Sequence, residues 1–159
     1  MFDVTLEAGK EKYKCHKVVL SIRSDVFKAM FKHGDMEENR TDSVKIRDVN
    51  SQILKKMIDY IYMDKVVDDL SGELLAASDK YNLQGLKDGC EAFLCRNANE
   101  KNVIHLFQLA YLHNTPGLQN VTMQIIKDHH DKLSKSPEWR EMKERYPDAL
   151  DFMVSLLSI

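Results

Sequence analysis

The sequence has little glycine, and its six glycines stand singly rather than in a cluster. It therefore contains no glycine-rich loop of the kind that holds nucleotide phosphates, and nucleotide binding is not indicated. No apolar run comes near the roughly 18 residues that a membrane-spanning helix needs. The N-terminus also lacks the basic and then apolar order of a signal peptide. We therefore expect neither a membrane partner nor secretion.

An excess of positive charge is lacking as well, since 23 lysines and arginines stand against 25 aspartates and glutamates. No basic cluster alternates with aromatic side chains, as it would in a nucleic-acid groove, so we expect no nucleic-acid partner. Cysteine is scarce: Cys15, Cys90 and Cys95 are an odd number at spacings that suit no disulfide framework. Such thiols serve as small apolar side chains in a reducing compartment, which predicts a nuclear or cytoplasmic protein.

Residue groups for catalysis or metal binding are equally hard to find. Cys90 and Cys95 do not share a helix face, and the adjacent side chains of His129 and His130 point apart. Neither pair has the geometry of metal ligands. We therefore expect no enzyme, no metal and no cofactor.

What the first part of the chain does contain is a mixture of strand and helix patterns. Residues 2–8 alternate apolar and polar side chains, which predicts a half-buried strand. Gly9 then marks a turn, and residues 12–15 predict the returning strand of a hairpin. A third short strand is expected at 43–46. Helical spacing between these strands predicts helices at 16–23 and 25–32.

From Ser51 onward the pattern is helical. Ser51 is a candidate N-cap for a helix through Tyr62, whose apolar side chains form a wide band on one side. Thr115 is a candidate N-cap with Pro116 at the first helical position. The polar residues 97–101 interrupt the pattern and mark the best internal boundary. Further helices are expected at 74–81, 83–94, 103–110 and 116–125, near Ser136, and from Pro147 onward.

Residues 2–31 resemble the opening of a BTB/POZ domain, and they read FDVTLEAGKEKYKCHKVVLSIRSDVFKAMF. That family opens with a strand hairpin ending in Ala-His-Lys and a helix reading Leu-x-x-Arg-Ser-x-x-Phe-x-x-Met-Phe. The resemblance continues through VKIRDVN, IDYIYMDK and LLAASDKYNLQGLKDGCEAFL. Within the family, the chain is most similar to the speckle-type POZ protein group, which includes TD and POZ domain-containing proteins. The helical tail of that group is similar to residues 136–157, SPEWREMKERYPDALDFMVSLL.

The resemblance implies an α+β fold. A BTB/POZ domain, which is a small three-stranded sheet capped by a helical cluster, is expected at residues 1–97. An all-helical extension similar to the 3-box or BACK region is expected at residues 98–159. The substrate-gripping MATH domain of the speckle-type POZ group has no counterpart in the sequence.

The resemblance also implies a function, that of a non-catalytic adaptor in a cullin-3 RING E3 ubiquitin ligase. Such adaptors bind the N-terminal region of cullin-3 through the BTB and 3-box region and recruit a substrate. In them a hydrophobic-x-Glu motif follows the Met-Phe helix, and Met36 and Glu38 fit it in the stretch HGDMEENR. The residue pattern alone leaves open that Met36 folds back onto its own core. Further cullin-binding positions implied by the resemblance are Phe31, His33, Tyr62, Lys80 and Tyr81, each of which the pattern alone also allows in the core.

BTB domains dimerise through the hairpin side and the helix that follows it. The dimer positions implied by the resemblance are Asp3, Lys17, Val18, Val19 and Ser21. The segment that precedes the first strand in the family is missing, so we expect a truncated dimer surface and weaker homodimers. Met153 matches a position of a second self-association surface. A homo- or heterodimerisation module without cullin binding is therefore the alternative function, with the chain itself or related BTB proteins as partners.

Overall fold

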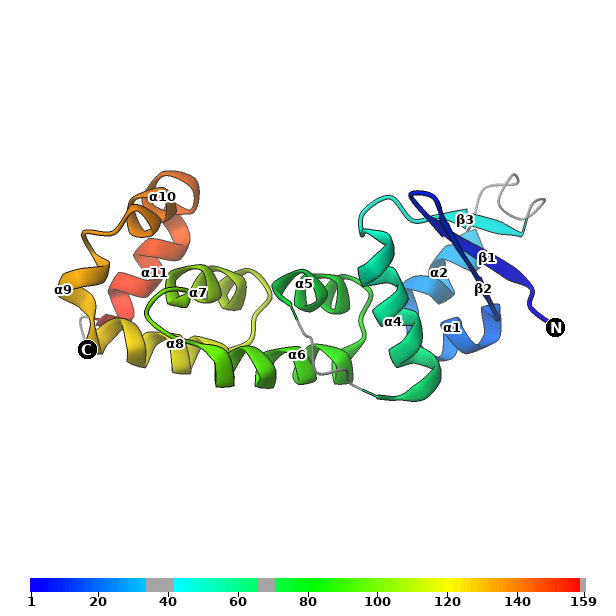
Figure 1. The fold of residues 1–159 in the computed structure, drawn as a ribbon, viewed down its shortest axis with the longest axis horizontal. Helices are drawn as coiled ribbons and strands as arrows, with labels where there is room; N and C mark the ends of the chain where they lie inside the picture. The colour runs from blue at the N-terminus through cyan, green and yellow to red at the C-terminus, as the bar shows by residue number, and fades with distance from the viewer. Residues whose placement is uncertain (34–41, 66–70, 158–159) are drawn as a thin grey trace. The chain divides into compact units, whose positions relative to one another are not determined.

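The computed structural model describes residues 1–33, 42–65 and 71–157. The chain divides into two compact units, Met1–Gly89 and Cys90–Ile159. Strands occur in the first unit, whereas the described part of the second unit is helical (Figure 1). The fold is therefore α+β, as predicted.

The first unit contains a three-stranded sheet with the order β2-β1-β3. The strands are β1 (Val4–Ala8), β2 (Glu11–Cys15) and β3 (Ser43–Lys45). β1 runs antiparallel to β2 across the turn at Gly9, where a positive φ of 62° suits a residue without Cβ. β1 also pairs in parallel with β3, with Leu6 opposite Val44. The period of two buries every second side chain of β1 and confirms the predicted hairpin.

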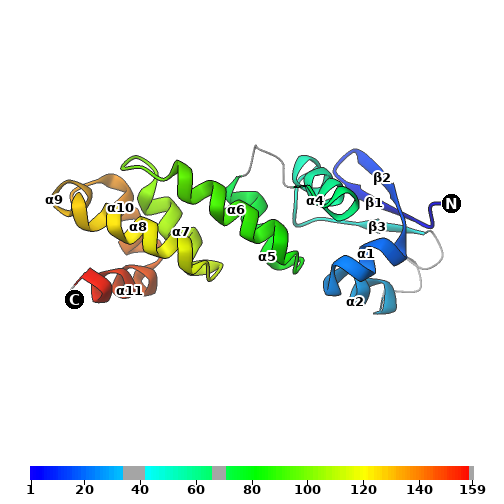
Figure 2. The same ribbon diagram turned by 90° about the horizontal axis from the view of Figure 1, so that it is seen from below.

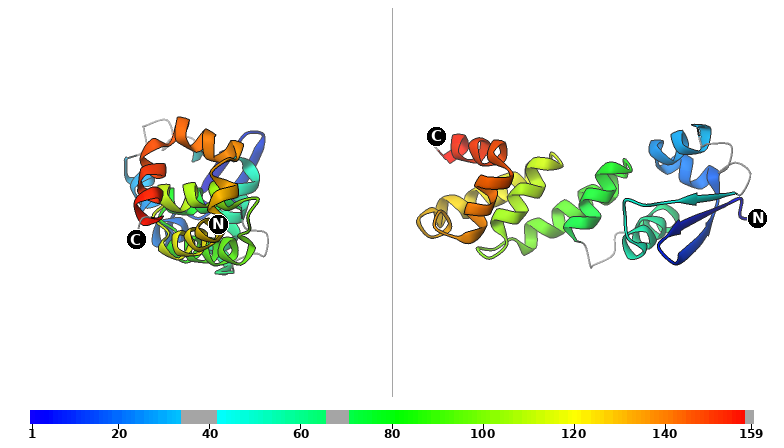
Figure 3. Two further views of the ribbon diagram at one scale, coloured as in Figure 1. Left: turned by 90° about the vertical axis from the view of Figure 1, so that its left-hand side faces the viewer. Right: turned by 90° about the horizontal axis from the view of Figure 1, so that it is seen from above.

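The helices of the first unit bury one face each. α1 (Lys17–Arg23) and α2 (Asp25–His33) lie side by side, as Figures 2 and 3 show. The other helices that begin in this unit are α4 (Ser51–Met63), α5 (Gly72–Lys80) and α6 (Gln84–Asn97). The largest fully buried side chains of this unit are Leu6, Leu20, Phe27, Leu54, Met57, Leu74, Leu75, Leu83 and Leu86.

The cap of α4 differs from the prediction by one residue. Asn50, rather than Ser51, is the N-cap, because its side-chain oxygen accepts a hydrogen bond from the backbone N–H of Ile53 at 2.9 Å. The helix ends where Asp64 adopts a left-handed conformation and donates its N–H to the carbonyl of Tyr60.

The second unit packs its helices around one apolar core. Its elements are α7 (Val103–Leu112), α8 (Pro116–Asp128), α9 (His130–Leu133), α10 (Pro137–Arg145) and α11 (Pro147–Leu157). Three of these helices begin with proline, whose fixed φ suits the first turn. The short helix α9 was not predicted. The buried residues of this core are Val103, Ile104, Phe107, Met123, Ile126, Leu133, Met142, Ala149, Leu150 and Met153.

The division between the units falls inside α6, at Gly89 and Cys90. The polar stretch after Asn97 does interrupt the helices, as predicted. There the Asn99 backbone N–H donates to Asn102 Oδ1 at 2.8 Å, and Asn102 Nδ2 donates to the Asn97 carbonyl at 3.0 Å. A domain boundary at 97/98 remains a prediction. Among the described residues, no helix is both long and apolar enough to cross a lipid bilayer.

Candidate docking site

The two residues at the centre of the predicted cullin site, Met36 and Glu38, lie outside the described residues. The structure describes the helix before them and the strand after them. α2 ends at His33, whose position but not side chain is described, and β3 begins at Ser43. The predicted docking segment therefore connects the end of α2 to an edge strand of the sheet.

Phe31 lies in the last turn of α2 and belongs to an aromatic cluster. Its ring stacks on that of Phe27 with a centroid distance of 6.1 Å. The ring of Phe27 is in turn 5.0 Å from that of Tyr81, which follows α5. Phe31 is half-buried, whereas Phe27 is fully buried. Two of the predicted cullin residues, Phe31 and Tyr81, are thus connected through Phe27.

Tyr81 itself is a core residue. Only 2% of it is exposed, and its hydroxyl donates to Asp48 Oδ1 at 2.9 Å. Burial, followed by the hydrogen bond to Asp48, raises the pKa of the Tyr81 hydroxyl. This corrects the expectation that the Tyr81 side chain lies on a docking surface. The ring of Tyr81 packs beside Phe27, and its hydroxyl has the Asp48 carboxylate as its hydrogen-bond acceptor.

Lys80, by contrast, is exposed and pairs with the same carboxylate, with Nζ 2.8 Å from Asp48 Oδ2. Burial opposes the charge of Asp48, but the hydrogen bonds from Lys80 and Tyr81 outweigh it and lower its pKa. Lys80 remains a candidate for contact with a partner.

Tyr62 lies near the start of α1. Its hydroxyl accepts a hydrogen bond from the His16 backbone N–H at 2.8 Å and lies 2.9 Å from His16 Nδ1. The ring of Phe2 is 4.8 Å from that of His16. Tyr62 is 40% exposed. Its contacts join it to the hairpin end and α1, where the dimer positions were predicted, and its assignment to a cullin surface remains a prediction.

Asp3 and Lys17 are neighbours, but they do not form the ion pair that their charges allow. Asp3 Oδ1 accepts a hydrogen bond from the Lys17 backbone N–H at 2.7 Å and so caps α1 from outside the helix. The ammonium group of Lys17 instead lies 3.1 Å from Asp42 Oδ1. This arrangement fixes the start of α1 against the beginning of the sheet.

The exposed face of α1 is apolar. Val18 is 61% exposed and Ile22 is 77% exposed, and they are one helical turn apart. The other two predicted dimer residues of α1, Val19 and Ser21, are half-buried. Ile22 was missed from the sequence, although its spacing of four from Val18 was a visible signal. We call Val18 and Ile22 the α1 apolar face.

Met153 lies in the core of the second unit and is fully buried. This corrects the expectation that its side chain forms a self-association surface. The neighbouring side chains Phe152 and Val154 are the exposed ones, at 37% and 44%. The ring of Phe152 lies 5.5 Å from that of Tyr111 on α7.

The described residues contain no group of three or more His, Cys, Asp or Glu side chains that could hold a metal ion. All three cysteines are thiols rather than disulfides. Burial raises the pKa of Cys15 to about 11, so this thiol is protonated at neutral pH.

Comparison with known proteins gives one consistent result. The BTB/POZ domain family matches residues 1–98. The mouse TD and POZ domain-containing protein 2 is 37% identical over 153 residues, which cover 94% of this chain and 42% of that protein. The mouse TD and POZ domain-containing protein 4 is 36% identical over 149 residues, covering 91% of this chain and 40% of that protein. The chain therefore spans about two fifths of the length of these relatives.

A solved structure agrees with the sequence comparison. The BTB domain of zebrafish PATZ1 superposes with a TM-score of 0.52 at 23% sequence identity. The superposition covers 60% of this chain and 76% of that domain. At this identity the likeness concerns the fold.

Proposed function

The chain belongs to the BTB/POZ domain family, whose members are protein-interaction modules, and from this premise we propose that it is a non-catalytic cullin-3 adaptor. It binds the N-terminal region of cullin-3 through its BTB and 3-box region and serves substrate recruitment in a cullin-3 RING ubiquitin ligase. The nucleus and cytoplasm are the proposed locations, which the three thiols support.

Segment 33–42 is the main support for this proposal. It connects α2 to β3 within the residues that match the family, and it contains Met36 between acidic neighbours. An unbranched thioether adapts to an irregular apolar pocket, and its burial contributes about 1.5 to 3 kcal/mol. The carboxylates of Asp35, Glu37 and Glu38 would attract a basic partner surface and fix its register.

The described residues near this segment have distinct roles in the proposal. Phe31, in the last turn of α2, offers half-buried aromatic surface, and Lys80 offers an exposed ammonium group. Tyr81 acts from the core by supporting Phe27, on which Phe31 stacks. Substitution of Tyr81 would therefore weaken docking only through the position of α2.

The second candidate function is a dimerisation module that does not bind cullin. The α1 apolar face favours it, because two large aliphatic side chains one turn apart are exposed to solvent. A second copy of the chain, or a related BTB protein, would cover that face. Dimerisation itself is compatible with the adaptor function, and the second candidate differs from the first in the absence of cullin binding.

Calorimetric titration with the N-terminal region of cullin-3 tests the adaptor function. We expect a Kd below about 1 µM for the wild type. Met36→Asp should weaken binding about ten- to a hundredfold, because about 1.4 kcal/mol corresponds to a factor of ten. Ile22→Asp is the matched control, since it places the same charge at an exposed apolar position outside the predicted cullin residues. Equal affinities of wild type and Met36→Asp would refute the proposed site.

Light scattering separates the second candidate from the first. Val18→Asp combined with Ile22→Asp should abolish self-association and leave cullin affinity unchanged. Glu38→Lys should weaken cullin binding without changing the self-association, with Asp88→Lys as the control for charge reversal at an exposed position of the first unit. A dimer that never binds cullin would favour the second function alone.

A further inference from the structure

The chain has three prolines, and two of them follow a serine or threonine, in the dipeptides Thr115-Pro116 and Ser136-Pro137. A serine or threonine before proline is the pair that proline-directed protein kinases modify. The two pairs differ in the exposure of the serine or threonine. Thr115 is 1% exposed. Ser136 is half-buried, and its neighbours Lys135 and Pro137 are exposed.

The backbone at Ser136 has the extended form that a kinase groove accepts, with φ −74° and ψ 156°. It lies on the short connection between α9 and α10, outside both helices. Its Oγ accepts a hydrogen bond from the Trp139 backbone N–H at 3.2 Å and so caps α10. An anionic group at this position would interact favourably with the positive end of a nine-residue helix.

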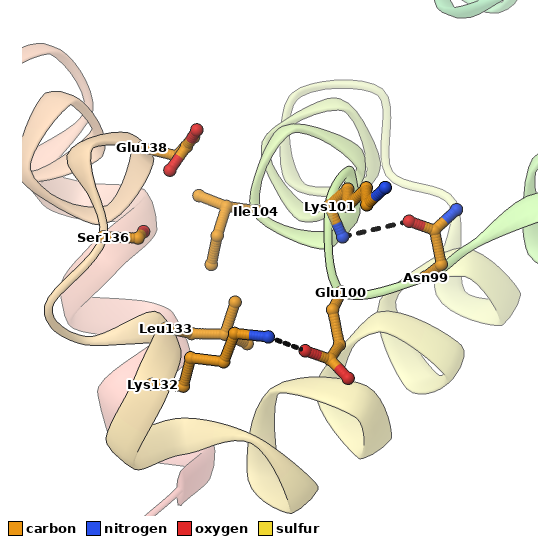
Figure 4. Close-up of a pocket in the computed structure, with 8 residues that line it drawn as sticks. All are labelled: Asn99, Glu100, Lys101, Ile104, Lys132, Leu133, Ser136 and Glu138. Carbon is orange, nitrogen blue, oxygen red and sulfur yellow. Dashed lines mark hydrogen bonds and ion pairs between the residues drawn. The ribbon is translucent and has the colours of Figure 1, made fainter.

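Ser136 also lines a cavity of about 700 Å³ in the second unit (Figure 4). Lys101 and Lys132 line the same cavity, with the apolar side chain of Ile104 between its charged groups. Lys132 Nζ lies 2.5 Å from Glu100 Oε2. Glu138 also lines the cavity and would repel a second anion. Lys101 and Lys132 are thus the two cations that line the cavity. The ammonium group of Lys132 binds Glu100, and the side chain of Lys101 is directed away from Ser136 in Figure 4.

We propose that Ser136 is a phosphorylation site for a proline-directed kinase, and that Lys101 and Lys132 receive the phosphoryl group in the cavity. In this step the Ser136 oxygen forms a bond to the γ-phosphorus of ATP, and the bond from that phosphorus to the β,γ-bridging oxygen breaks. ADP leaves, and the hydroxyl proton passes to a basic group of the kinase. The new dianion then competes with Glu100 for Lys132.

Treatment of the full chain with a proline-directed kinase and MgATP, followed by peptide mass mapping, tests the modification. We expect one phosphoryl group on Ser136 and none on Thr115, which serves as the buried internal control. Ser136→Ala and Pro137→Ala should each remove that incorporation, whereas Ser134→Ala should leave it unchanged. A folded chain that stays unmodified at Ser136, or that is modified equally at Thr115, would overturn the proposal.

Phosphorus NMR of the modified chain tests the receiving lysines. The second pKa of the phosphoserine should be lower in the folded protein than in a peptide of residues 130–142 carrying the same group. Replacing both Lys101 and Lys132 by alanine should return that pKa toward the peptide value, with Lys143→Ala as an exposed control. Equal pKa values in the folded protein and the peptide would exclude the cavity as the receptor.

Discussion

The two units are held together in different ways. In the first unit, side chains form hydrogen bonds between residues far apart in the sequence. Ser24 Oγ donates to the Tyr81 carbonyl at 2.6 Å, across 57 residues, and the Tyr13 hydroxyl donates to the Ser51 carbonyl at 3.0 Å. The core of the second unit is apolar and includes Met123 and Met142. Directional bonds fix the elements of the first unit relative to one another, whereas flexible apolar side chains tolerate repacking.

This difference fits the roles proposed for the units. A docking surface needs rigid support, and the Tyr81 and Ser24 contacts hold the start of α2, the helix whose other end leads into the proposed docking segment. In the second unit, the proposed modification site lies on a short connection beside an open cavity. The ion pair of Lys132 and Glu100, which lines that cavity, is largely exposed.

The largest effects should come from deleting the central ring of either core. Phe27→Ala and Phe107→Ala each remove a fully buried aromatic ring, so each should lower the free energy of unfolding by about 3 to 5 kcal/mol. Hydrogen exchange with mass spectrometry should show faster exchange within the unit that carries the substitution. Equally faster hydrogen exchange in both units would show that they unfold together, and would contradict the view that each unit is stabilised by its own core.

Two smaller effects on the free energy of unfolding should distinguish the hydrogen-bonded packing of the first unit from the apolar packing of the second. Tyr81→Phe leaves the Asp48 carboxylate without its buried donor and should cost about 1 to 3 kcal/mol in free energy of unfolding. Met153→Leu conserves the volume of the second core and should cost less than about 1.5 kcal/mol. Urea denaturation measures both. A larger loss in free energy of unfolding for Met153→Leu than for Tyr81→Phe would contradict this difference between the units.

The first unit should contribute to the pH dependence of stability through Asp48. The folded state lowers the pKa of Asp48, so its contribution is fully present above the unfolded value of about 3.8. As pH falls below that value, the unfolded chain binds the proton more readily, and the contribution is lost as pH falls through the folded pKa. Asp48→Asn should reduce the loss of free energy of unfolding as the pH falls, measured by urea denaturation between pH 2 and about 6. An unchanged profile would contradict the role given to the carboxylate.

The smallest effect is expected at Thr115. Its buried hydroxyl oxygen has no hydrogen-bond partner among the described residues, so Thr115→Val should leave stability unchanged or raise it by up to about 1 kcal/mol. Ser24→Ala is the matched case in the first unit, where the buried hydroxyl caps α2 and donates to a carbonyl. It should cost about 1 to 2 kcal/mol. Thermal unfolding of the two variants measures the contrast.

Local patterns in the sequence predicted much of the fold. The alternation in residues 2–8 gave the first strand, and Pro116 and Pro147 gave the starts of two helices. The parallel pairing of β1 with β3 was not predicted, because strand alternation carries no information on partners. Tyr81 was misplaced for a similar reason, since its hydroxyl partner Asp48 is 33 residues away.

The candidate site was predictable only in part. Val18 was predicted by resemblance and is exposed, whereas Ile22 could have been found from its helical spacing of four from Val18. Met153 was carried over by resemblance, whereas its burial depends on how α11 packs in the second core. Met36 and Glu38 lie outside the described residues, so their role stays a prediction.

Hydrogen exchange of the chain with and without the N-terminal region of cullin-3 tests the central claim most directly. If segment 33–42 docks on cullin, peptides that cover it should exchange more slowly in the complex, while peptides from the hairpin of β1 and β2 should not change. Unchanged exchange in that segment at tens of micromolar cullin would contradict the adaptor function.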